Sequence, residues 1–372
     1  MSRRLRLILG TALSLALVGG LVVSLLVGSG SPSTQSAFPL SARSEFFGIS
    51  QGSRLDREDL EKMEATGVEA DRFMLNWELA ESRRGAFHWP DLVVGSLAAH
   101  GIRPVPFVWG TPGWLGVARA HPPVGSVERE RAWQNFLTLA VQRYGPGGSY
   151  WKTGYREQFG AGATPLPVTA WQIWNEPNLS KYFAPEPSVS QYARLLRISD
   201  EAITSEDPHA RIVLAGMPGY GDVTAWKFLD DLYGQPGIEE HFDAAALHPY
   251  ASDLDLQRRI LQRFRAAMTT HGDRATPVWI TEFGWGSAPP DRFGINKGLR
   301  GQARLLSGSF RLMLGHRRAW NIQRVFWFYW RDPAPNEQAV ECSFCRSSGL
   351  LQDNRDPKPA YHAFKRFVSG RH

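Results

Sequence analysis

Residues 170–177 read AWQIWNEP, a mostly apolar run that ends abruptly in Asn175, Glu176 and Pro177. A short apolar run bounded by polar residues and proline is typical of a β-strand. The same pattern recurs along the chain and predicts eight strands in all. Besides residues 170–174, the predicted strands are residues 46–50, 68–75, 103–108, 211–215, 242–247, 277–281 and 322–329.

Helical patterns fill the intervals between these runs. Residues 56–66 are charged on one side and end at Gly67, where a C-terminal glycine is expected. Apolar residues recur at helical spacing between 256 and 268, and a last helix is predicted near residues 358–368. Alternating strands and helices imply parallel strands with crossover helices. Eight repeats predict a (β/α)8 barrel, the TIM barrel, rather than an open doubly wound sheet.

The N-terminal region differs from the rest in composition. Leu7–Val27 contains no charged residue and follows Arg3, Arg4 and Arg6. A secretory apolar core usually has about 7–15 residues, whereas a membrane-spanning helix needs about 20. The length favours an uncleaved membrane anchor, and small residues just after it leave a cleaved signal as the alternative. In both cases we expect export, with residues 1–37 as signal-anchor and linker and residues 38–372 as one barrel domain.

Charge and cysteine content exclude several classes of protein. The formal net charge is +6, but three of the arginines belong to the N-terminal region and no basic stripe stands out, so nucleic-acid binding is not expected. Cys342 and Cys345 are the only cysteines, and no histidine lies near them at metal-site spacing. A short structural disulfide is therefore the favoured interpretation, in agreement with export.

The ends of the predicted strands carry many polar and aromatic residues. In a TIM barrel the C-terminal strand ends form the active site. The fourth and seventh strands end in Glu176 and Glu282, and they lie on opposite sides of an eight-stranded ring. Hydrolysis of a glycosidic bond needs one protonated and one ionised carboxyl group on opposite sides of that bond. This pair predicts a glycosidase. The ten histidines include no close pair at ligand spacing, so no metal is expected, and no cofactor is expected either.

The surroundings of each glutamate suggest its role. Arg72 and Tyr250, at the ends of the second and sixth strands, are expected to contact Glu282 and to favour its ionised form, which makes it the nucleophile. Glu176 follows an apolar run that contains Trp171 and Trp174. Desolvation there would raise the pKa of Glu176 and keep it protonated, as an acid/base requires.

Further strand-end residues are candidates for binding or support. Asn175 is expected to hydrogen-bond the sugar 2-hydroxyl. The alternative is that it is only a turn residue at the end of its strand. His248 is either a supporting residue or a satisfied core histidine. Trp330 is preferred over Trp327 because it lies at the end of its strand, and about half of the tryptophans are expected to pack in the core. The predicted sugar-binding tryptophans are Trp77, Trp109, Trp285 and Trp330.

These motifs resemble a known group of enzymes. Residues 174–178 (WNEPN) are similar to the acid/base signature of clan A, the large barrel clan of retaining glycosidases, and residues 279–285 (WITEFGW) resemble its nucleophile strand. His248-Pro249-Tyr250 and Arg72 are similar to the supporting residues of that clan. The resemblance implies net retention, with the carboxyl groups about 5–5.5 Å apart.

Within the clan, residues 143–151 (RYGPGGSYW) most resemble the family 39 type, especially bacterial members associated with exopolysaccharides. Cys342 to Cys345, after residues 330–332 (WRD), fits the same group. The likeness runs from residue 46 to about residue 367 and lacks the accessory β-sandwich of the β-xylosidase branch, so hydrolysis is implied more strongly than xylosidase activity. Endo-action on a β-linked extracellular polysaccharide is expected, and exo-action on short oligosaccharides is the alternative.

Two other functions fit parts of the sequence. Residues 48–52 (GISQG) match the Gly-x-Ser-x-Gly elbow of serine esterases, but no earlier strand exists to supply an oxyanion loop. A sugar-binding pseudoenzyme would share the groove without the reaction, and the presence of both glutamates disfavours it. Activity on a panel of polysaccharides separates the pseudoenzyme from the hydrolase.

Overall fold

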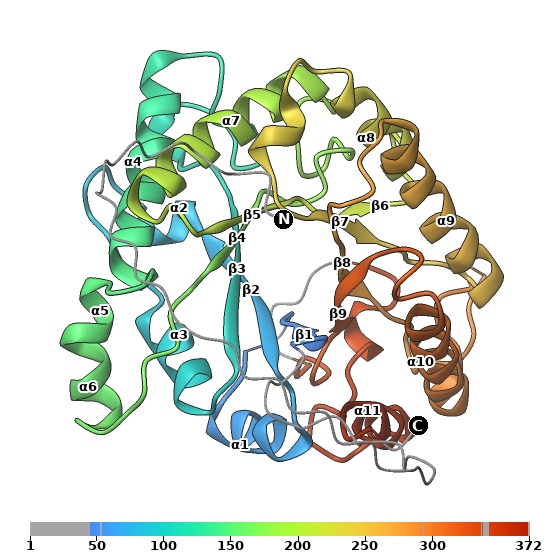
Figure 1. The fold of residues 1–372 in the computed structure, drawn as a ribbon. Helices are drawn as coiled ribbons and strands as arrows, with labels where there is room; N and C mark the ends of the chain where they lie inside the picture. The colour runs from blue at the N-terminus through green and yellow to red at the C-terminus, as the bar shows by residue number, and fades with distance from the viewer. Residues whose placement is uncertain (1–44, 53, 293, 336, 338–341, 371–372) are drawn as a thin grey trace, which may run out of the picture. The chain divides into compact units, whose positions relative to one another are not determined.

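The computed structural model describes residues 45–52, 54–292, 294–335, 337 and 342–370. Over these residues, parallel strands form a central ring and helices surround it (Figure 1). The Leu7–Val27 run and the linker after it lie outside the described residues. Within them, no helix is both long enough and apolar enough to cross a membrane.

The ring contains all eight predicted strands, and every pairing between named strands is parallel. Its order is β5-β4-β3-β2-β1-β9-β8-β7-β6. The strands are β1 (Phe47–Ser50), β2 (Ala70–Asn76), β3 (Arg103–Trp109), β4 (Ala170–Ile173), β5 (Arg211–Leu214), β6 (Met217–Pro218), β7 (Ala245–His248), β8 (Val278–Phe283) and β9 (Ile322–Phe328).

The fifth predicted strand, residues 211–215, corresponds to β5, and the two-residue strand β6 follows it; together they close the ring. β5 pairs with β4, whereas β6 pairs with β7. Val213 on β5 also forms a parallel bridge with Ala244, and the backbone N–H of Leu214 donates to the carbonyl of Ala244 at 2.9 Å. Because one strand thus contacts both of its neighbours, the sheet has no free edge and is a barrel rather than an open sheet.

The helices begin and end near the predicted signals. At the start of the first helix, the Asp56 side chain accepts from the N–H of Asp59, and the Asp59 side chain accepts from the N–H of Asp56. Gly67 ends that helix in a left-handed conformation, with φ at 90°. The helices are α1 (Arg57–Thr66), α2 (Trp77–Ala80), α3 (Asp91–Ala99), α4 (Val127–Tyr144), α5 (Ser149–Lys152), α6 (Gly154–Phe159), α7 (Val189–Glu206), α8 (Ala225–Tyr233), α9 (Leu254–Thr270), α10 (Gly298–Gly315) and α11 (Pro359–Val368), with short 3-10 turns η1 (Gly113–Leu115), η2 (Ile238–His241) and η3 (Cys345–Ser347).

Side chains fill the inside of the barrel beneath the strand ends. Small residues from several strands pack there around the rings of Trp279 and Phe326, whose centroids lie 6.4 Å apart. A Cβ atom at Gly48 would lie 2.5 Å from the Phe326 ring, so glycine is needed at that position. The barrel is therefore a packed core that supports the strand ends from below.

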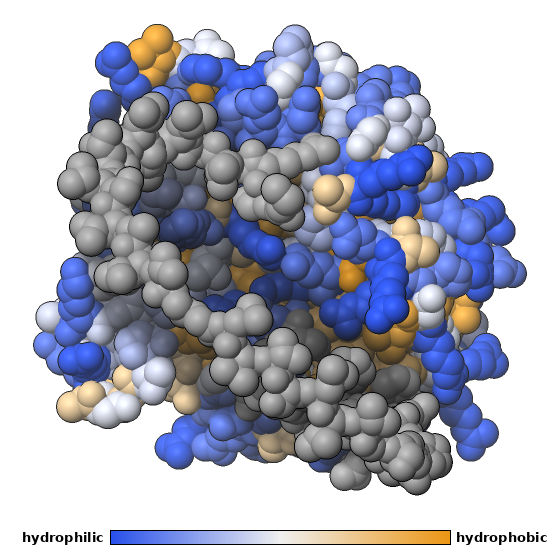
Figure 2. Space-filling view, in the orientation of Figure 1, coloured by the Kyte–Doolittle hydropathy of each residue, from blue (hydrophilic) through white to orange (hydrophobic). Residues whose placement is uncertain are grey.

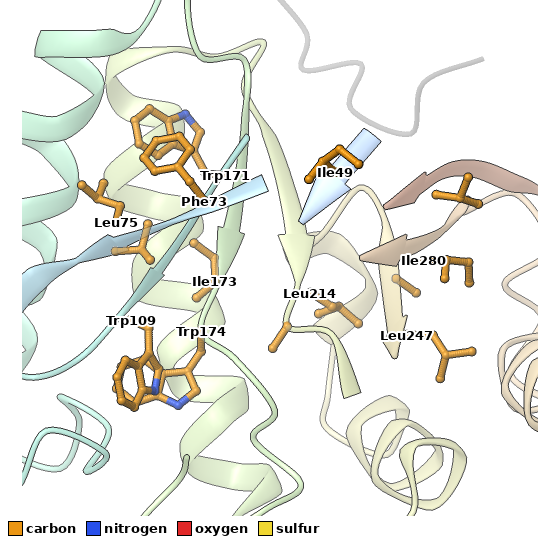
Figure 3. Close-up of a cluster of buried hydrophobic side chains, with 14 of the residues drawn as sticks. Ile49, Phe73, Leu75, Trp109, Trp171, Ile173, Trp174, Leu214, Leu247 and Ile280 are labelled. Carbon is orange, nitrogen blue, oxygen red and sulfur yellow. The ribbon is translucent and has the colours of Figure 1, made fainter. Parts of the chain in front are cut away.

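A second and larger core lies between the strands and the helices. Outward-facing residues such as Phe73, Ile173 and Ile280 belong to it (Figure 3). Trp171 also packs in this layer, and residues 170 and 172 of the same strand face the barrel interior instead. This alternation is the normal pattern of a strand with two covered faces.

Candidate active site

A bulge in β8 determines where Glu282 points. Trp279 and Thr281 face the barrel interior, so simple alternation would direct Glu282 outward toward the helices. Between Ile280 and Phe283, however, β8 holds one more residue than the facing part of β9. An extra residue of this kind re-aims the following side chain. The Glu282 side chain consequently faces the barrel interior, as the Thr281 side chain does. Phe283 faces outward and packs on Phe310.

At the end of β4, unusual backbone angles direct side chains toward the mouth of the barrel. Trp174 and Glu176 both have positive φ, at 73° and 44°. Such values are uncommon for residues other than glycine and occur at functional sites. They let Asn175 and Glu176, although adjacent, both face the mouth of the barrel. The N–H of Glu176 donates to the carbonyl of Gly216 at 3.1 Å and fixes this turn.

Arg72 connects Glu282 to Asn175. The side chain is completely buried, and its guanidinium donates to Glu282 Oε1 at 2.6 Å and to Asn175 Oδ1 at 3.0 Å. The other N–H groups donate to Ser50 Oγ at 3.0 Å and to Gln172 Oε1 at 2.6 Å. A buried arginine needs such a complete set of partners. The contact expected between Arg72 and Glu282 is present.

Two further groups contact the carboxyl pair. The Tyr250 hydroxyl donates to Glu282 Oε2 at 2.8 Å, as expected. His248 Nδ1 lies 2.8 Å from Glu176 Oε1, and Nε2 lies 3.0 Å from the Thr281 hydroxyl. One oxygen of each glutamate and one ring nitrogen of His248 all lie within 4.8 Å of one another. His248 is thus buried, but it is a partner of the pair as well as a core residue.

Burial and charge separate the two glutamates. Desolvation raises the pKa of Glu176 well above its usual value, and the negative charge of Glu282 adds to the rise. Burial lowers the pKa of His248 well below its usual value, and the nearby Arg72 lowers it further, so the imidazole is neutral. Glu282, by contrast, has the direct ion pair with Arg72. The neutral carboxyl group expected at Glu176 and the carboxylate expected at Glu282 agree with these surroundings.

Several supporting residues were not predicted, among them Gln172, Thr281 and Gly216. Gln172 accepts from Arg72 and donates to the Leu214 carbonyl at 2.9 Å, so it links three strands. A glutamine inside the apolar run AWQIW is a signal that points to such a role. Thr281 bonds His248, and a Cβ at Gly216 would lie only 1.9 Å from the imidazole. Neither residue carries a comparable signal in the sequence.

The prediction of tryptophan platforms is wrong for three of the four candidates. Trp77, Trp285 and Trp330 are at most 1% exposed, so none of them has a face open to a sugar. Their positions at strand ends do not decide which way they point, and all three pack in the outer core. Trp327, the alternative to Trp330, is buried as well.

Trp109 is a supporting residue rather than an open platform. It is 7% exposed, and its indole N–H donates to the Tyr182 carbonyl at 3.3 Å. The guanidinium of Arg119 covers its ring at 5.0 Å from the ring centre. Two tyrosines from the loops also lie near the carboxyl pair, the exposed Tyr220 and the half-buried Tyr182.

A metal site and an esterase site are both disfavoured by the contacts. By distance alone, Glu176, His248 and Glu282 could hold a cation. The guanidinium of Arg72 already bonds Glu282, and its positive charge opposes a second cation. Ser50 of the Gly-x-Ser-x-Gly motif is buried and accepts from Arg72, so the hydroxyl supports the barrel site instead of forming a separate nucleophile.

Cys342 and Cys345 are joined by a disulfide in the structure. Cys345 begins η3, where the Ser347 and Ser348 carbonyls accept from the side-chain amide of Gln302 on α10. The disulfide therefore lies in a loop that is bonded to the barrel helices.

Two cavities of the structure lie away from the carboxyl pair. A cavity of about 690 Å³ lies beside Trp114 and Arg84, and one of about 750 Å³ lies between α1 and α3. Neither is lined by Glu176 or Glu282. On the face in Figure 2, the coloured surface is mainly hydrophilic, with scattered hydrophobic residues. The chemistry of the strand ends identifies the site.

Comparison with known families agrees with this geometry. Residues 150–355 match the family model described as glycosyl hydrolase catalytic core. The chain belongs to this family. The matched part of the hydrolase includes Glu176, His248 and Glu282, while Arg72 precedes it. No curated protein matches the hydrolase.

Solved structures of glycoside hydrolases share the fold of this hydrolase. A family 39 enzyme from Bacteroides cellulosilyticus WH2 is 20% identical, with a TM-score of 0.63 over 88% of this chain and 64% of that one. A family 39 enzyme from Xanthomonas axonopodis pv. citri is 18% identical, with a TM-score of 0.61 over 88% and 67%. A family 5 enzyme from Streptomyces cattleya is 17% identical, with a TM-score of 0.64 over 87% and 80%. The hydrolase thus spans less than two thirds of the Bacteroides enzyme.

Proposed function

We propose that this hydrolase cleaves β-linked glycans by double displacement with net retention. Glu282 attacks the anomeric carbon while Glu176 gives its proton to the glycosidic oxygen, so the bond to the leaving sugar breaks and a glycosyl ester of Glu282 forms. Glu176 then removes a proton from water, the water oxygen attacks the same carbon, and the carboxylate of Glu282 is released.

The observation that carries this proposal is the unequal environment of two carboxyl groups at close range. Their nearest oxygens lie within 4.8 Å, which fits the separation of about 5–5.5 Å in retaining enzymes and not the wider gap that holds a water in inverting ones. Arg72 and Tyr250 both donate to Glu282, whereas Glu176 faces neutral His248. One group is thereby prepared as a nucleophile and the other as an acid.

Asn175 and Arg72 extend this site toward the sugar. Asn175 Oδ1 is occupied by Arg72, which leaves the amide nitrogen as the free donor of the side chain for the 2-hydroxyl of the reacting sugar. A bond to that hydroxyl strengthens at the transition state. Arg72 therefore orients both the nucleophile and the group that would bind next to it.

For the substrate we propose an extracellular β-linked polysaccharide cleaved at internal bonds. The Streptomyces neighbour was solved with Manβ1-4GlcNAc, and a Caulobacter crescentus neighbour is described as a β-xylosidase, so β-linked sugars fit barrels of this shape. Size analysis of products from a panel of β-linked polysaccharides tests the mode of action. Mixed oligosaccharides in the first minutes support internal cleavage, and monosaccharide alone contradicts it.

We also propose that the barrel is exported. The support is the uncharged Leu7–Val27 run after a basic flank, which favours a membrane anchor over a cleaved signal. Fractionation of cells that make the full chain, with protease added outside, tests this. Membrane-bound protein that the protease reaches supports the anchor, and a wholly soluble form that begins near residue 30 supports cleavage.

The anomeric configuration of the first product tests the reaction itself. Nuclear magnetic resonance of a digest should detect the β-anomer before mutarotation produces the α-anomer. The α-anomer first would contradict double displacement. No product from any β-linked glycan in the panel, together with measurable binding, would support the sugar-binding pseudoenzyme instead.

A further inference from the structure

Two loops at the mouth of the barrel are bonded to each other. The β4–α7 loop, residues 174–188, carries Glu176, and the β6–α8 loop, residues 219–224, lies beside it. The side-chain nitrogen of Asn178 donates to the carbonyls of Pro218 at 3.1 Å and Val223 at 2.6 Å, on both sides of the second loop. The N–H of Val223 donates back to the Asn178 carbonyl at 3.2 Å. The β6–α8 loop is therefore fixed against the loop of the acid/base.

Packing brings the two loops into direct contact. A Cβ atom at Gly221 would lie 1.9 Å from a methyl group of Leu179, and Gly221 has φ at 100°. Both facts require glycine there. The N–H of Leu179 donates to the Glu176 carbonyl at 3.0 Å, so Leu179 belongs to the turn of the acid/base. Tyr220, next to Gly221, is consequently held close to Glu176.

The side chain of Tyr220 is open to a ligand. It is 52% exposed and is the most exposed of the aromatic residues in the described part of the chain. At the same time, surrounding protein and the charges of Glu176 and Glu282 raise the pKa of its hydroxyl. The Tyr220 side chain is thus exposed to solvent and close enough to the carboxyl pair for both charges to act on its hydroxyl.

Tyr182 on the β4–α7 loop lies near the same place. The charges of Glu176 and Glu282 and the neighbouring Tyr220 contribute to the raised pKa of Tyr182, after burial. Its carbonyl accepts from the indole N–H groups of Trp109 at 3.3 Å and Trp174 at 2.7 Å, which fixes the backbone beneath the ring. Two tyrosines from adjoining loops thus lie by the acid/base, one of them open and the other firmly supported.

We infer that Tyr220, with Tyr182 beside it, binds the sugar unit on the leaving-group side of the cleaved bond. Glu176 delivers its proton to the oxygen of that unit, so the departing sugar must lie against the loops that carry and adjoin Glu176. A tyrosine face packs on the apolar C–H face of a sugar ring, and its hydroxyl bonds the rim. This inference rests on the proposed function, because it requires Glu176 to be the acid/base.

Reactivation of a trapped glycosyl-enzyme tests the leaving-group side by itself. Wild type and variants are labelled with dinitrophenyl 2-fluoro-β-glycosides of glucose, mannose and xylose, and excess reagent is removed. A β-linked disaccharide of the labelled sugar is then added as acceptor. Its hydroxyl attacks the anomeric carbon, the bond to Glu282 breaks, and Glu176 takes the hydroxyl proton. The measured quantity is the ratio of reactivation with acceptor to reactivation in buffer.

We expect Tyr220→Ala to lower this ratio roughly tenfold, and Tyr220→Phe to retain most of it because the ring remains. Trp320→Ala is the matched control, since Trp320 precedes β9 at the opposite end of the barrel, where it stacks on His316. A wild-type ratio of one, or a Tyr220→Ala ratio within twofold of wild type, overturns the inference alone. Failure of every reagent to label wild type overturns the proposed function as well.

Discussion

Arg72 is the residue on which most contacts of the site depend. It bonds Glu282, Asn175, Ser50 and Gln172, and the ring of Phe107 lies 4.0 Å below its guanidinium carbon. A planar guanidinium can satisfy several partners in fixed directions, whereas the ammonium of lysine acts as a point charge. The orientation of the nucleophile therefore depends on the shape of this side chain as well as on its charge.

The substitution Arg72→Lys is expected to lower kcat by roughly 100-fold, the scale of one lost directional contact in an active site. The charge beside Glu282 remains, but Asn175 and Gln172 lose their donor. Steady-state kinetics on an activated aryl glycoside measure the effect. Arg194→Lys is the control, because Arg194 pairs with Glu130 on the outer helices. Equal kcat for Arg72→Lys and wild type would contradict the role of Arg72.

The raised pKa of Glu176 predicts the alkaline limb of activity. The reaction needs Glu176 protonated, and burial with the nearby charge of Glu282 raises its pKa. Activity should be present below that pKa and fall as pH rises through it. In Glu176→Gln, the residual hydrolysis of a dinitrophenyl glycoside, whose leaving group needs no proton, should lack this fall. An unchanged alkaline limb in the variant would assign the limb to another group.

At the scale of elements, departures from regular strand geometry place the catalytic groups. The apolar runs predicted each strand, and the polar residues after them predicted the site. Alternation alone would point the Glu282 side chain outward to the helices, and the bulge in β8 turns it toward the barrel interior. The turn after β4 uses positive φ at Trp174 and Glu176. A linear sequence indicates where a strand ends but not how its last residues turn, which is why the prediction for Trp77, Trp285 and Trp330 failed.

Strand β2 also contains Asp71, a buried acidic residue that takes no part in the active site. Neither carboxylate oxygen of Asp71 has a hydrogen-bond partner among the described residues, and burial raises its pKa well above the usual value. The folded state therefore keeps Asp71 protonated at pH values where the unfolded chain has ionised it. The resulting contribution to stability is complete below the unfolded pKa and is lost as pH rises toward the folded one.

We expect Asp71→Asn to remove this pH dependence, so that the substitution raises the free energy of unfolding more at pH 8 than at pH 5. Urea unfolding at pH 5 and pH 8 measures this difference. The control is Asp59→Asn, which should destabilise because Asp59 accepts from the buried Arg331 at 3.1 Å. The idea fails if Asp71→Asn and wild type lose the same stability between the two pH values.

For the whole molecule, the prediction of the fold rested mainly on the order of strands and helices along the chain. Eight apolar runs separated by helical patterns indicated a closed barrel, and the contact between Val213 and Ala244 closes it. The barrel then brings Arg72, Glu176, His248, Tyr250 and Glu282 together from four strands or their ends. Tyr182 and Tyr220 could not be predicted in the same way, because they lie on loops whose paths depend on contacts such as that of Asn178 with Pro218.

If Glu282 is the nucleophile of a retaining mechanism, it is the residue that carries a trapped glycosyl group. Wild type is labelled with a dinitrophenyl 2-fluoro-β-glycoside that inactivates it, digested, and sequenced by mass spectrometry. We expect one fluoroglycosyl group, attached to Glu282 in the peptide that contains residues 279–285, and no such group on Glu282→Gln. A label on Glu176 or on any other residue would contradict the assignment of Glu282 as the nucleophile.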